Sequence, residues 1–504
     1  MGIIAKQSIQ GTIVTYLGVA VGFVTTFFVL TRFLSAEEIG LARVLIDAAT
    51  LFIGLAQLGT SSSIIRFYPH FRSQEQGTNN QDDHGFFFWT LIVPLIGFIL
   101  FTAVYCACHE PLSCWFGEKS PLFVEYYYMV LPIAFFMLYQ TVFETNVNVR
   151  MHIVVPRAVR ELITRVGLLI VYLLYAFHVV DIDGFIIALC GVYAVAMLSN
   201  LVYLFSLGEI SLRPDWEFLR SNRSLVRQYL LYTGFLLISA VASVLAPTLS
   251  SFFITAEMGL NYTGIFAIAT YIAVMVSIPY RSMIAIASPQ LATAIKDDNH
   301  AEIAHLMQQV SRSILLIGSL ILCVIWVNID LIFHILPNGD TYASAREVVL
   351  LLGISQLFIA TCSITSSALN YSRYYALSLI FSVLLTASSI LLNNYLIPIL
   401  GMDGAAMSNL VSYAVYYILI VIAVRCTLRT ATFAREHAYI ILLFAVILIM
   451  NFLWQRYLPI QNIWLSSIIR SFVLLGSAGV VAWCANLSPE INNQVRSFRR
   501  KAKG

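Results

Sequence analysis

Charged side chains are rare in this sequence, and two arginines stand at or just inside the ends of long apolar segments. Arg66 closes the segment 41–66, and Arg281 lies about one helical turn from the end of the segment 262–285. A guanidinium group presents paired donors that fit the oxygens of a phosphate or diphosphate. Both side chains also fit a simpler role, in which they reach the lipid headgroups at a membrane surface. Arg281 lies deeper and is the better candidate for an anion ligand.

Acidic residues inside apolar segments are the second group of candidates. An ionisable side chain is costly in a membrane and usually faces a partner or a cavity. We predict a structural ion pair between Glu144 and Arg165. Asp47 follows Arg43 at the spacing of a helical ion pair. Asp47 is alternatively a proton or sodium site, and Glu257 is a weaker candidate for that coupling role.

Several kinds of chemistry find no support in the sequence. It has no nucleophile–base arrangement, no glycine loop that would cradle a nucleotide phosphate and no metal-ligand spacing among its eight cysteines. We therefore expect no catalytic residue, no metal and no cofactor, with proton or sodium coupling as the one ion requirement left open. The net charge of +3 is spread over the polar connections, so we expect no nucleic-acid partner.

Long apolar segments must position these residues. Of the 504 residues, 59% are hydrophobic and 11% are charged, and about 20 apolar residues suffice for a helix to cross the hydrocarbon core. We predict an all-α integral membrane protein with about fourteen transmembrane helices; a count of twelve follows if the last two only lie at the membrane surface. The predicted spans are 11–34, 41–66, 86–108, 122–148, 160–180, 184–207, 228–254, 262–285, 313–336, 346–369, 376–400, 404–425, 438–457 and 464–485.

Basic residues predict the orientation of these helices. With the N-terminus in the cytoplasm, the inner segments hold 23 of the 29 Lys and Arg residues, in line with the positive-inside bias. The others, on or toward the outer side, are Arg32, Arg43, Lys119, Arg346, Arg456 and Arg470. Both termini are therefore predicted to be cytoplasmic, with the basic tail 486–504 against anionic lipids.

A short internal repeat predicts two similar halves. The residues Ile182-Asp183-Gly184 and Tyr193-Ala194-Val195 return 220 positions later as Met402-Asp403-Gly404 and Tyr413-Ala414-Val415, and Gly40 corresponds to Gly264 at an offset of 224. Six helices return the chain to its starting side, so the halves run in the same direction. We predict an N-lobe at 1–210, a C-lobe at 211–430, an appended helix pair at 431–485 and the tail at 486–504.

A polar connection at 297–312 is predicted to form a separate helix on the membrane face, before the span 313–336. Asn299 and Glu302 resemble a capping box. An apolar stripe at helical spacing follows, made of Ile303, Leu306, Met307 and Val310.

Four short segments resemble the polysaccharide-export flippases, a branch of the multidrug/oligosaccharidyl-lipid/polysaccharide exporter superfamily. They are Thr31–Gly40 (TRFLSAEEIG), Leu58–Pro69 (LGTSSSIIRFYP), Ser288–Ala292 (SPQLA) and Gly401–Ala406 (GMDGAA). The likeness in layout covers nearly the whole chain. It implies two pseudo-symmetric six-helix lobes around a central cavity, alternating access to that cavity, and a substrate that is a short oligosaccharide on a polyprenyl diphosphate.

The same resemblance implies roles for individual residues. Arg66 and Arg281 would lie beside the cavity as ligands of the diphosphate, and Arg32 would guide it on the outer side. Relatives that flip the peptidoglycan precursor carry an Arg-Asp pair in the first helix. This chain has Phe27–Leu30 (FFVL) there, which argues against that substrate.

We therefore expect a non-enzymatic flippase in a bacterial cell membrane. It would move lipid-linked oligosaccharide to the outer leaflet for a surface polysaccharide such as O-antigen or capsule, with membrane lipids and other polysaccharide-assembly proteins as partners. One alternative is a cation-coupled multidrug antiporter of the same superfamily, although deep acidic residues are scarce here. A polysaccharide polymerase or ligase is less favoured, because it would need a long outer loop.

Overall fold

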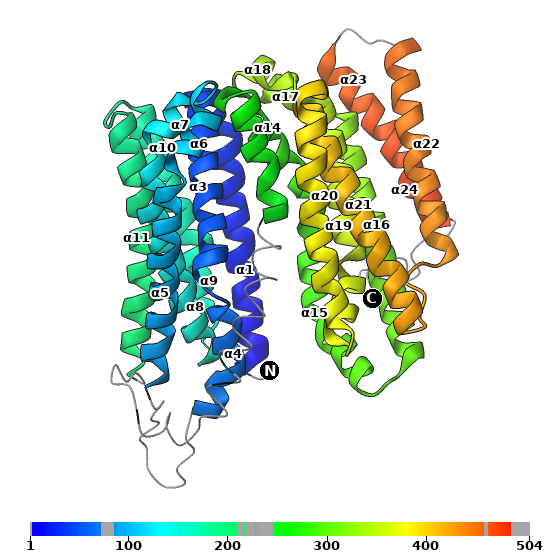
Figure 1. The fold of residues 1–504 in the computed structure, drawn as a ribbon. Coiled ribbons are helices and arrows are strands. Elements are labelled where there is room, and N and C mark those ends of the chain that lie inside the picture. The colour runs from blue at the N-terminus through cyan, green and yellow to red at the C-terminus, as the bar shows by residue number, and fades with distance from the viewer. Residues whose placement is uncertain are drawn as a thin grey trace. The chain divides into compact units, whose positions relative to one another are not determined.

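A computed structural model describes residues 3–71, 85–150, 152–208, 216, 227, 229, 245–457 and 462–484. Much of the predicted span 228–254 and the whole basic tail 486–504 lie outside the described residues. The chain divides into two units, residues 1–264 (unit 1) and 265–504 (unit 2). Each unit is a bundle of helices (Figure 1).

The helices of unit 1 run alongside one another, with α8 packed between α3 and α11 (Figure 1). Its elements are α1 (Ile3–Val24), η1 (Thr25–Leu30), α2 (Thr31–Phe33), α3 (Ala36–Ala56), α4 (Thr60–Phe71), α5 (Phe86–Ala107), α6 (His109–Gly117), α7 (Pro121–Glu125), η2 (Tyr127–Met129), α8 (Val130–Val149), α9 (Val154–Ala158), η3 (Val159–Ile163), α10 (Thr164–Ala176) and α11 (Ile182–Ser206). A further helix covers 245–257.

Local sequence explains where α3 begins and ends. Ser35 caps it with a reciprocal pair of bonds: the Ser35 hydroxyl accepts from the Glu38 backbone N–H, and the Glu38 carboxylate accepts from the Ser35 N–H. At its other end Leu58 and Gly59 have φ values of 48° and 71°, the left-handed region that glycine adopts at little cost. The chain turns there, so the predicted span 41–66 is two helices, α3 and α4.

Unit 2 contains the remaining helices. They are α14 (Leu260–Val274, which begins in unit 1), η4 (Met275–Ser277), α15 (Ile278–Lys296), α16 (His300–Val327), α17 (Ile329–Ile335), α18 (Gly339–Ala343), α19 (Arg346–Tyr371), α20 (Tyr375–Leu400), α21 (Met402–Thr427), α22 (Arg435–Tyr457), α23 (Ile463–Arg470), η5 (Ser471–Leu475) and α24 (Gly476–Cys484).

Helix α16 corrects one sequence prediction. Asn299 caps it as expected, since its side chain accepts from the Glu302 N–H at 3.1 Å. The helix then continues without interruption to Val327, so 297–312 is not a separate helix on the membrane face. No proline stands between His300 and Val327 to end it. The apolar stripe that was expected to face the membrane is buried in the core of unit 2.

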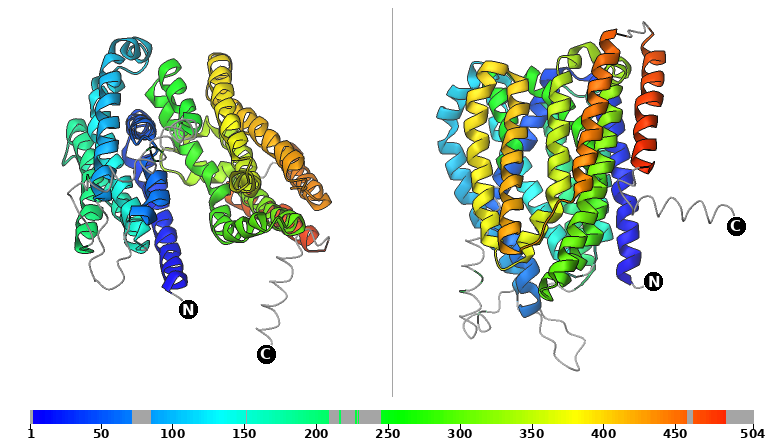
Figure 2. Two further views of the ribbon diagram at one scale, coloured as in Figure 1. Left: turned by 60° about the horizontal axis from the view of Figure 1, so that its bottom comes forward. Right: turned by 90° about the vertical axis from the view of Figure 1, so that its right-hand side faces the viewer.

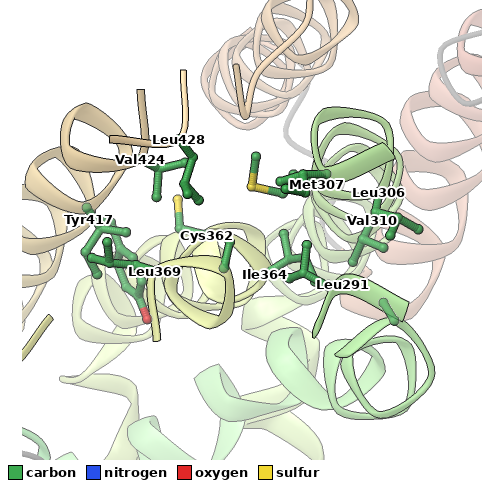
Figure 3. Packing of buried hydrophobic residues seen from close by; sticks show 14 of the residues in the cluster. Leu291, Leu306, Met307, Val310, Cys362, Ile364, Leu369, Tyr417, Val424 and Leu428 are labelled. Atoms are coloured by element: carbon green, nitrogen blue, oxygen red, sulfur yellow. The ribbon is translucent and has the colours of Figure 1, made fainter. Parts of the chain in front are cut away.

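That core lies between α15, α16, α19 and α21. Figure 3 shows side chains from the four helices meeting there, with Leu291, Met307, Ile364, Leu369 and Val424 completely buried. Lipid tails are as apolar as these side chains, so close packing rather than removal from water holds such helices together.

The last two long helices pack on α16. Cys323 and Val327 of α16 form a buried cluster with Ile447 of α22 and with Leu474 and Ala478 of the final helix, α23–η5–α24. Figure 2 shows α22 in orange and this final helix in red at one edge of unit 2.

Twelve of the described helices are long and apolar enough to cross a membrane. They correspond to the predicted spans except the fifth and the seventh. The fifth, 160–180, is helical as far as Ala176, but Arg160, Glu161 and Arg165 stand near its start. The seventh is 228–254, which is largely outside the described residues. The chain is therefore a multi-pass, all-helical membrane protein throughout its described part.

Candidate functional site

A chain of four charged side chains crosses unit 1 where α8 meets the helix 154–176 (α9, η3 and α10). Arg160 Nη1 donates to Glu144 Oε1 at 2.9 Å, and Arg160 Nε lies 3.7 Å from Glu161 Oε1. Arg165 Nη2 lies 3.0 Å from Glu161 Oε2. The Glu144 and Glu161 side chains are only 13% and 11% exposed. Each carboxylate thus has a guanidinium partner, as buried charges require, and the four charges cancel.

Glycines on α1 allow this charged helix to approach. A Cβ on Gly18 would overlap the backbone carbonyl of Glu161, and a Cβ on Gly22 would overlap the Arg165 guanidinium. Arg165 Nη1 also donates to the carbonyl oxygen of Gly18 at 3.0 Å. The charged chain therefore extends from α8 to the backbone of α1.

Both helices at this contact depart from regular α geometry. Arg160 and Glu161 lie in η3, a stretch of π-helix, and Thr164 Oγ1 donates to the Val159 carbonyl at 3.2 Å. A second π-helical segment, η1, directly follows α1 and contains Phe27–Leu30. Short π segments inside helices are frequent at functional sites, which makes this part of unit 1 a candidate.

The expected direct pair between Glu144 and Arg165 needs correction. Glu144 is bonded to Arg160, whereas Arg165 is bonded to Glu161, its i–4 neighbour. Sequence reasoning missed Arg160 and Glu161. A cluster of charges could have indicated them, because four charged residues stand within nine positions, at 157, 160, 161 and 165. Spacing alone, however, does not say which of these side chains reaches α8.

The three arginines expected to bind diphosphate lie on different elements. Arg281 is in the first turn of α15 with an exposed side chain. Arg32 is exposed on α2, with its guanidinium 5.5 Å from the centre of the Phe33 ring. Arg66 lies in α4, and its side chain is outside the described residues. Arg32 and Arg66 belong to unit 1, and Arg281 belongs to unit 2.

The two carboxylates expected to couple transport to an ion gradient differ in burial. Asp47 is 6% exposed and accepts from Arg43 Nε at 2.8 Å, in the i, i+4 pair that the spacing suggests. Glu257 is exposed at the end of the helix 245–257.

Two tyrosine hydroxyls bind carboxylates of neighbouring helices in unit 1. Tyr126 donates to Asp183 of the repeated motif, and Tyr175 donates to Glu38. Each of these hydrogen bonds joins two elements of unit 1 that lie far apart in the sequence.

The sequence places this chain in a known family, and the fold is similar to that of solved membrane proteins. It belongs to the family described as "Polysaccharide biosynthesis protein", whose model matches residues 4–294. None of the curated protein sequences matches it. The fold resembles that of a lipid II flippase and of MATE family transporters.

Solved structures show the same fold at low sequence identity. The lipid II flippase MurJ in its inward closed conformation is similar, with a TM-score of 0.71 and 12% identity over 95% of this chain and 99% of that chain. An inward-facing multidrug resistance MATE family transporter has a TM-score of 0.63 and 16% identity over 82% of this chain and 95% of its own. The Vibrio cholerae MATE transporter VcmN in its bent form has a TM-score of 0.54 and 16% identity over 84% of this chain and 98% of its own.

Proposed function

We propose that this protein is a flippase that moves a polyprenyl-diphosphate-linked oligosaccharide from the cytoplasmic to the outer leaflet by alternating access. It would act in a bacterial cell membrane, for the synthesis of a surface polysaccharide. The membership in a polysaccharide biosynthesis family supports the substrate class.

The observation that favours the flippase most is the extent of the structural likeness. The flippase fold covers 95% of this chain, whereas the two MATE folds cover 82% and 84%. The difference is about the size of the appended segment 431–485, which contains α22 and the final helix. The flippase fold therefore matches more of this chain than the antiporter folds do.

Diphosphate recognition is assigned to Arg281, Arg66 and Arg32. Carrying a diphosphate and several sugars through hydrocarbon is costly, and guanidinium forks in a hydrated cavity would lower that cost. The prenyl chain would remain in lipid. This proposal includes two lobes at 1–210 and 211–430 that enclose the cavity, both termini in the cytoplasm, and other polysaccharide-assembly proteins as partners.

The substrate is proposed to differ from the peptidoglycan precursor. The first helix has Phe27–Leu30 in place of an Arg-Asp pair, and Phe27, Val29 and Leu30 are buried in η1. This apolar, packed segment supports a glycan other than lipid II.

Coupling to a proton or sodium gradient would need a carboxylate that can change its charge or bind the ion. Asp47 is buried but already paired with Arg43, and this pairing supports a structural role. Glu257 is exposed, and within the described part of the chain it has no ion pair. Both stay proposals for the coupling site.

A cation-coupled multidrug antiporter is the second candidate, because MATE transporters share the fold. The two functions predict different cargo: an anionic lipid-linked glycan for the flippase and an organic cation for the antiporter.

Reconstituted vesicles can decide between them. The purified protein would be placed in vesicles that contain a polyprenyl-diphosphate-linked oligosaccharide in both leaflets. A membrane-impermeant glycosidase added outside would then digest the inner-leaflet pool only if the protein flips it. Arg373→Ala, at an exposed arginine beyond the end of α19, is the matched control for Arg281→Ala. Gradient-driven uptake of ethidium without glycan flipping would establish the antiporter instead.

A further inference from the structure

Polar side chains from four helices converge at one end of unit 2. Arg346, at the start of α19, has its Nη1 3.4 Å from Oδ1 of Asp330 on α17. Arg470, at the end of α23, has its Nη2 4.0 Å from Oδ2 of the same carboxylate. Gln455 of α22 accepts from Arg346 Nη2 at 3.1 Å and donates to Asp330 Oδ2 at 3.3 Å. We call these four residues the Arg346–Arg470 site.

The site has more positive than negative charge. Two guanidinium groups share one carboxylate, and neither makes a short ion pair with it. The Arg470 side chain is 4% exposed, and among the described residues its only hydrogen bond is from Nε to the Ser466 carbonyl at 3.4 Å. Its two terminal nitrogens, which carry four N–H donors, have no acceptor there. A buried charge with so little compensation is unfavourable unless another group completes it.

Further buried polar atoms extend the site along the two appended helices. Asn451 lies one turn before Gln455 on α22, and Ser467 lies one turn before Arg470, so each shares a helix face with a site residue. Both are 1% exposed. In the described part of the chain, neither the amide atoms of Asn451 nor the Ser467 hydroxyl has a hydrogen-bond partner, and the same holds for Arg346 Nε. Buried polar groups are normally satisfied by protein, water or a ligand.

The depth of the site suits a lipid headgroup. Asp330 and Arg346 form its open side, each with a side chain 35% exposed. Arg470 follows Ile463 by seven residues, which places it about 10 Å from the helix end at the usual rise. The guanidinium of Arg346 lies 5.4 Å from the centre of the Trp326 ring, and tryptophan is typical of the membrane interface. The site therefore extends from the expected membrane interface into the bundle between α17, α19, α22 and α23.

We propose that the Arg346–Arg470 site binds the phosphate group of a membrane lipid. A phosphate accepts paired, charge-assisted bonds from guanidinium groups, so it would satisfy the free donors of Arg470 and balance the excess charge. Asp330 and Gln455 hold the two arginines in position while the site is open. This inference concerns α17, α19, α22 and α23, and it does not depend on the cargo proposed above.

A lipid fits this position better than a soluble anion. Ile468 and Phe472, on either side of Arg470 in sequence, are 63% and 82% exposed. These side chains lie on the face of the final helix opposite to Arg470, since residues two apart do not share a helix face. That exposed apolar face borders lipid in a membrane, so lipid headgroups are the anions closest to the site.

Lipid binding to the full-length, detergent-solubilised protein tests the proposal. The probe is phosphatidic acid, titrated and counted by native mass spectrometry, with phosphatidylcholine as the zwitterionic comparison. We expect Arg470→Gln and Arg346→Gln each to weaken phosphatidic acid binding at least about tenfold, because each removes charge-assisted bonds. Arg373→Gln, at the opposite end of α19 from Arg346, should bind like the wild type. Equal binding by the wild type and both site variants overturns the proposal.

Asp330→Asn separates a ligand site from a purely structural ion pair. Removing the competing carboxylate should strengthen phosphatidic acid binding several-fold if the arginines serve a phosphate. If the cluster only joins helices, the variant lowers the melting temperature and leaves lipid binding unchanged, which refutes the site. Inorganic phosphate tests whether the bound phosphate group belongs to a lipid or to a soluble anion. Displacement of phosphatidic acid by millimolar phosphate overturns the assignment to a lipid. Failure of phosphate to compete supports that assignment. Arg346→Gln affects a partly exposed residue, so the test survives if Arg470→Gln fails to fold.

Discussion

Gly40 of α3 and Gly264 of α14 face each other across a reciprocal backbone contact. A Cβ on Gly40 would overlap the carbonyl oxygen of Leu260, four residues before Gly264. A Cβ on Gly264 would overlap the carbonyl oxygen of Ala36, four residues before Gly40. Such an exchange of equivalent contacts is what a two-fold axis produces. The two glycines are the pair that the offset of 224 matches in the sequence.

This contact predicts that Gly40→Ala and Gly264→Ala destabilise the protein. The added methyl group meets backbone, which cannot rotate away, so α3 and α14 must separate at a cost of about 1–3 kcal/mol. Thermal unfolding in detergent measures the effect. Gly191→Ala is the control, since a Cβ at that helical glycine meets no atom within 4 Å, and it should leave stability unchanged or raise it. A normal melting temperature for both test variants would mean that the helices are not held this closely.

The charged chain of unit 1 predicts coupling between Glu161 and Arg165. Glu161→Gln leaves Arg165 without its carboxylate and removes the longer contact of Arg160, and it should lower stability by about 1–3 kcal/mol. In the double variant with Arg165→Gln, part of that loss should return, giving a coupling energy of about 0.5–3 kcal/mol in a double-mutant cycle. Arg43 belongs to another ion pair, so in the double variant of Glu161→Gln and Arg43→Gln the two losses of stability should add. Additivity for Glu161 and Arg165 as well would contradict the 3.0 Å contact between them.

The Arg43–Asp47 pair makes a separate prediction about ion coupling. Asp47→Asn should lower the melting temperature, because the buried carboxylate loses its charge-assisted bond to Arg43. Transport should still depend on the ion gradient if the pair is structural. Loss of gradient dependence with normal stability would instead make Asp47 the coupling site, and Glu257→Gln is the parallel test for the second candidate.

Arg281 predicts a change in transport without a change in stability. Its side chain is exposed, so Arg281→Ala should unfold at the wild-type temperature. Flipping of the diphosphate-linked glycan should fall at least about tenfold if the paired bonds to phosphate are lost. Arg281→Lys keeps the charge but loses the planar guanidinium group. Its flipping rate should therefore lie between those of the wild type and Arg281→Ala. Wild-type rates for both variants would remove Arg281 from the proposed substrate path.

Local patterns in the sequence predicted most of the helices. Long apolar segments marked the helices of membrane-spanning length, and Asn299 marked the start of α16. The continuity of α16 was missed because a polar stretch looked like a connection, although nothing in it stops a helix. The turn at Leu58 and Gly59 was missed for the opposite reason, since no charged residue interrupts the segment between Asp47 and Arg66.

The contacts of the charged residues were harder to predict. The i, i+4 pair of Arg43 and Asp47 follows from spacing within one helix. The bond between Glu144 and Arg160 joins two helices. Which arginine reaches Glu144 depends on how η3 is rotated relative to α8. Asp330 was missed altogether because its partners, Arg346 and Arg470, lie on other helices, and no spacing within one helix joins them to it.

The contact between Gly40 and Gly264 has the form of a contact between two identical subunits. Each helix offers the other a glycine and the carbonyl of the residue four positions before it, as the two chains of a symmetric dimer do. A side chain at position 40 or 264 would meet the backbone of the other helix, so this close approach needs a glycine at both positions.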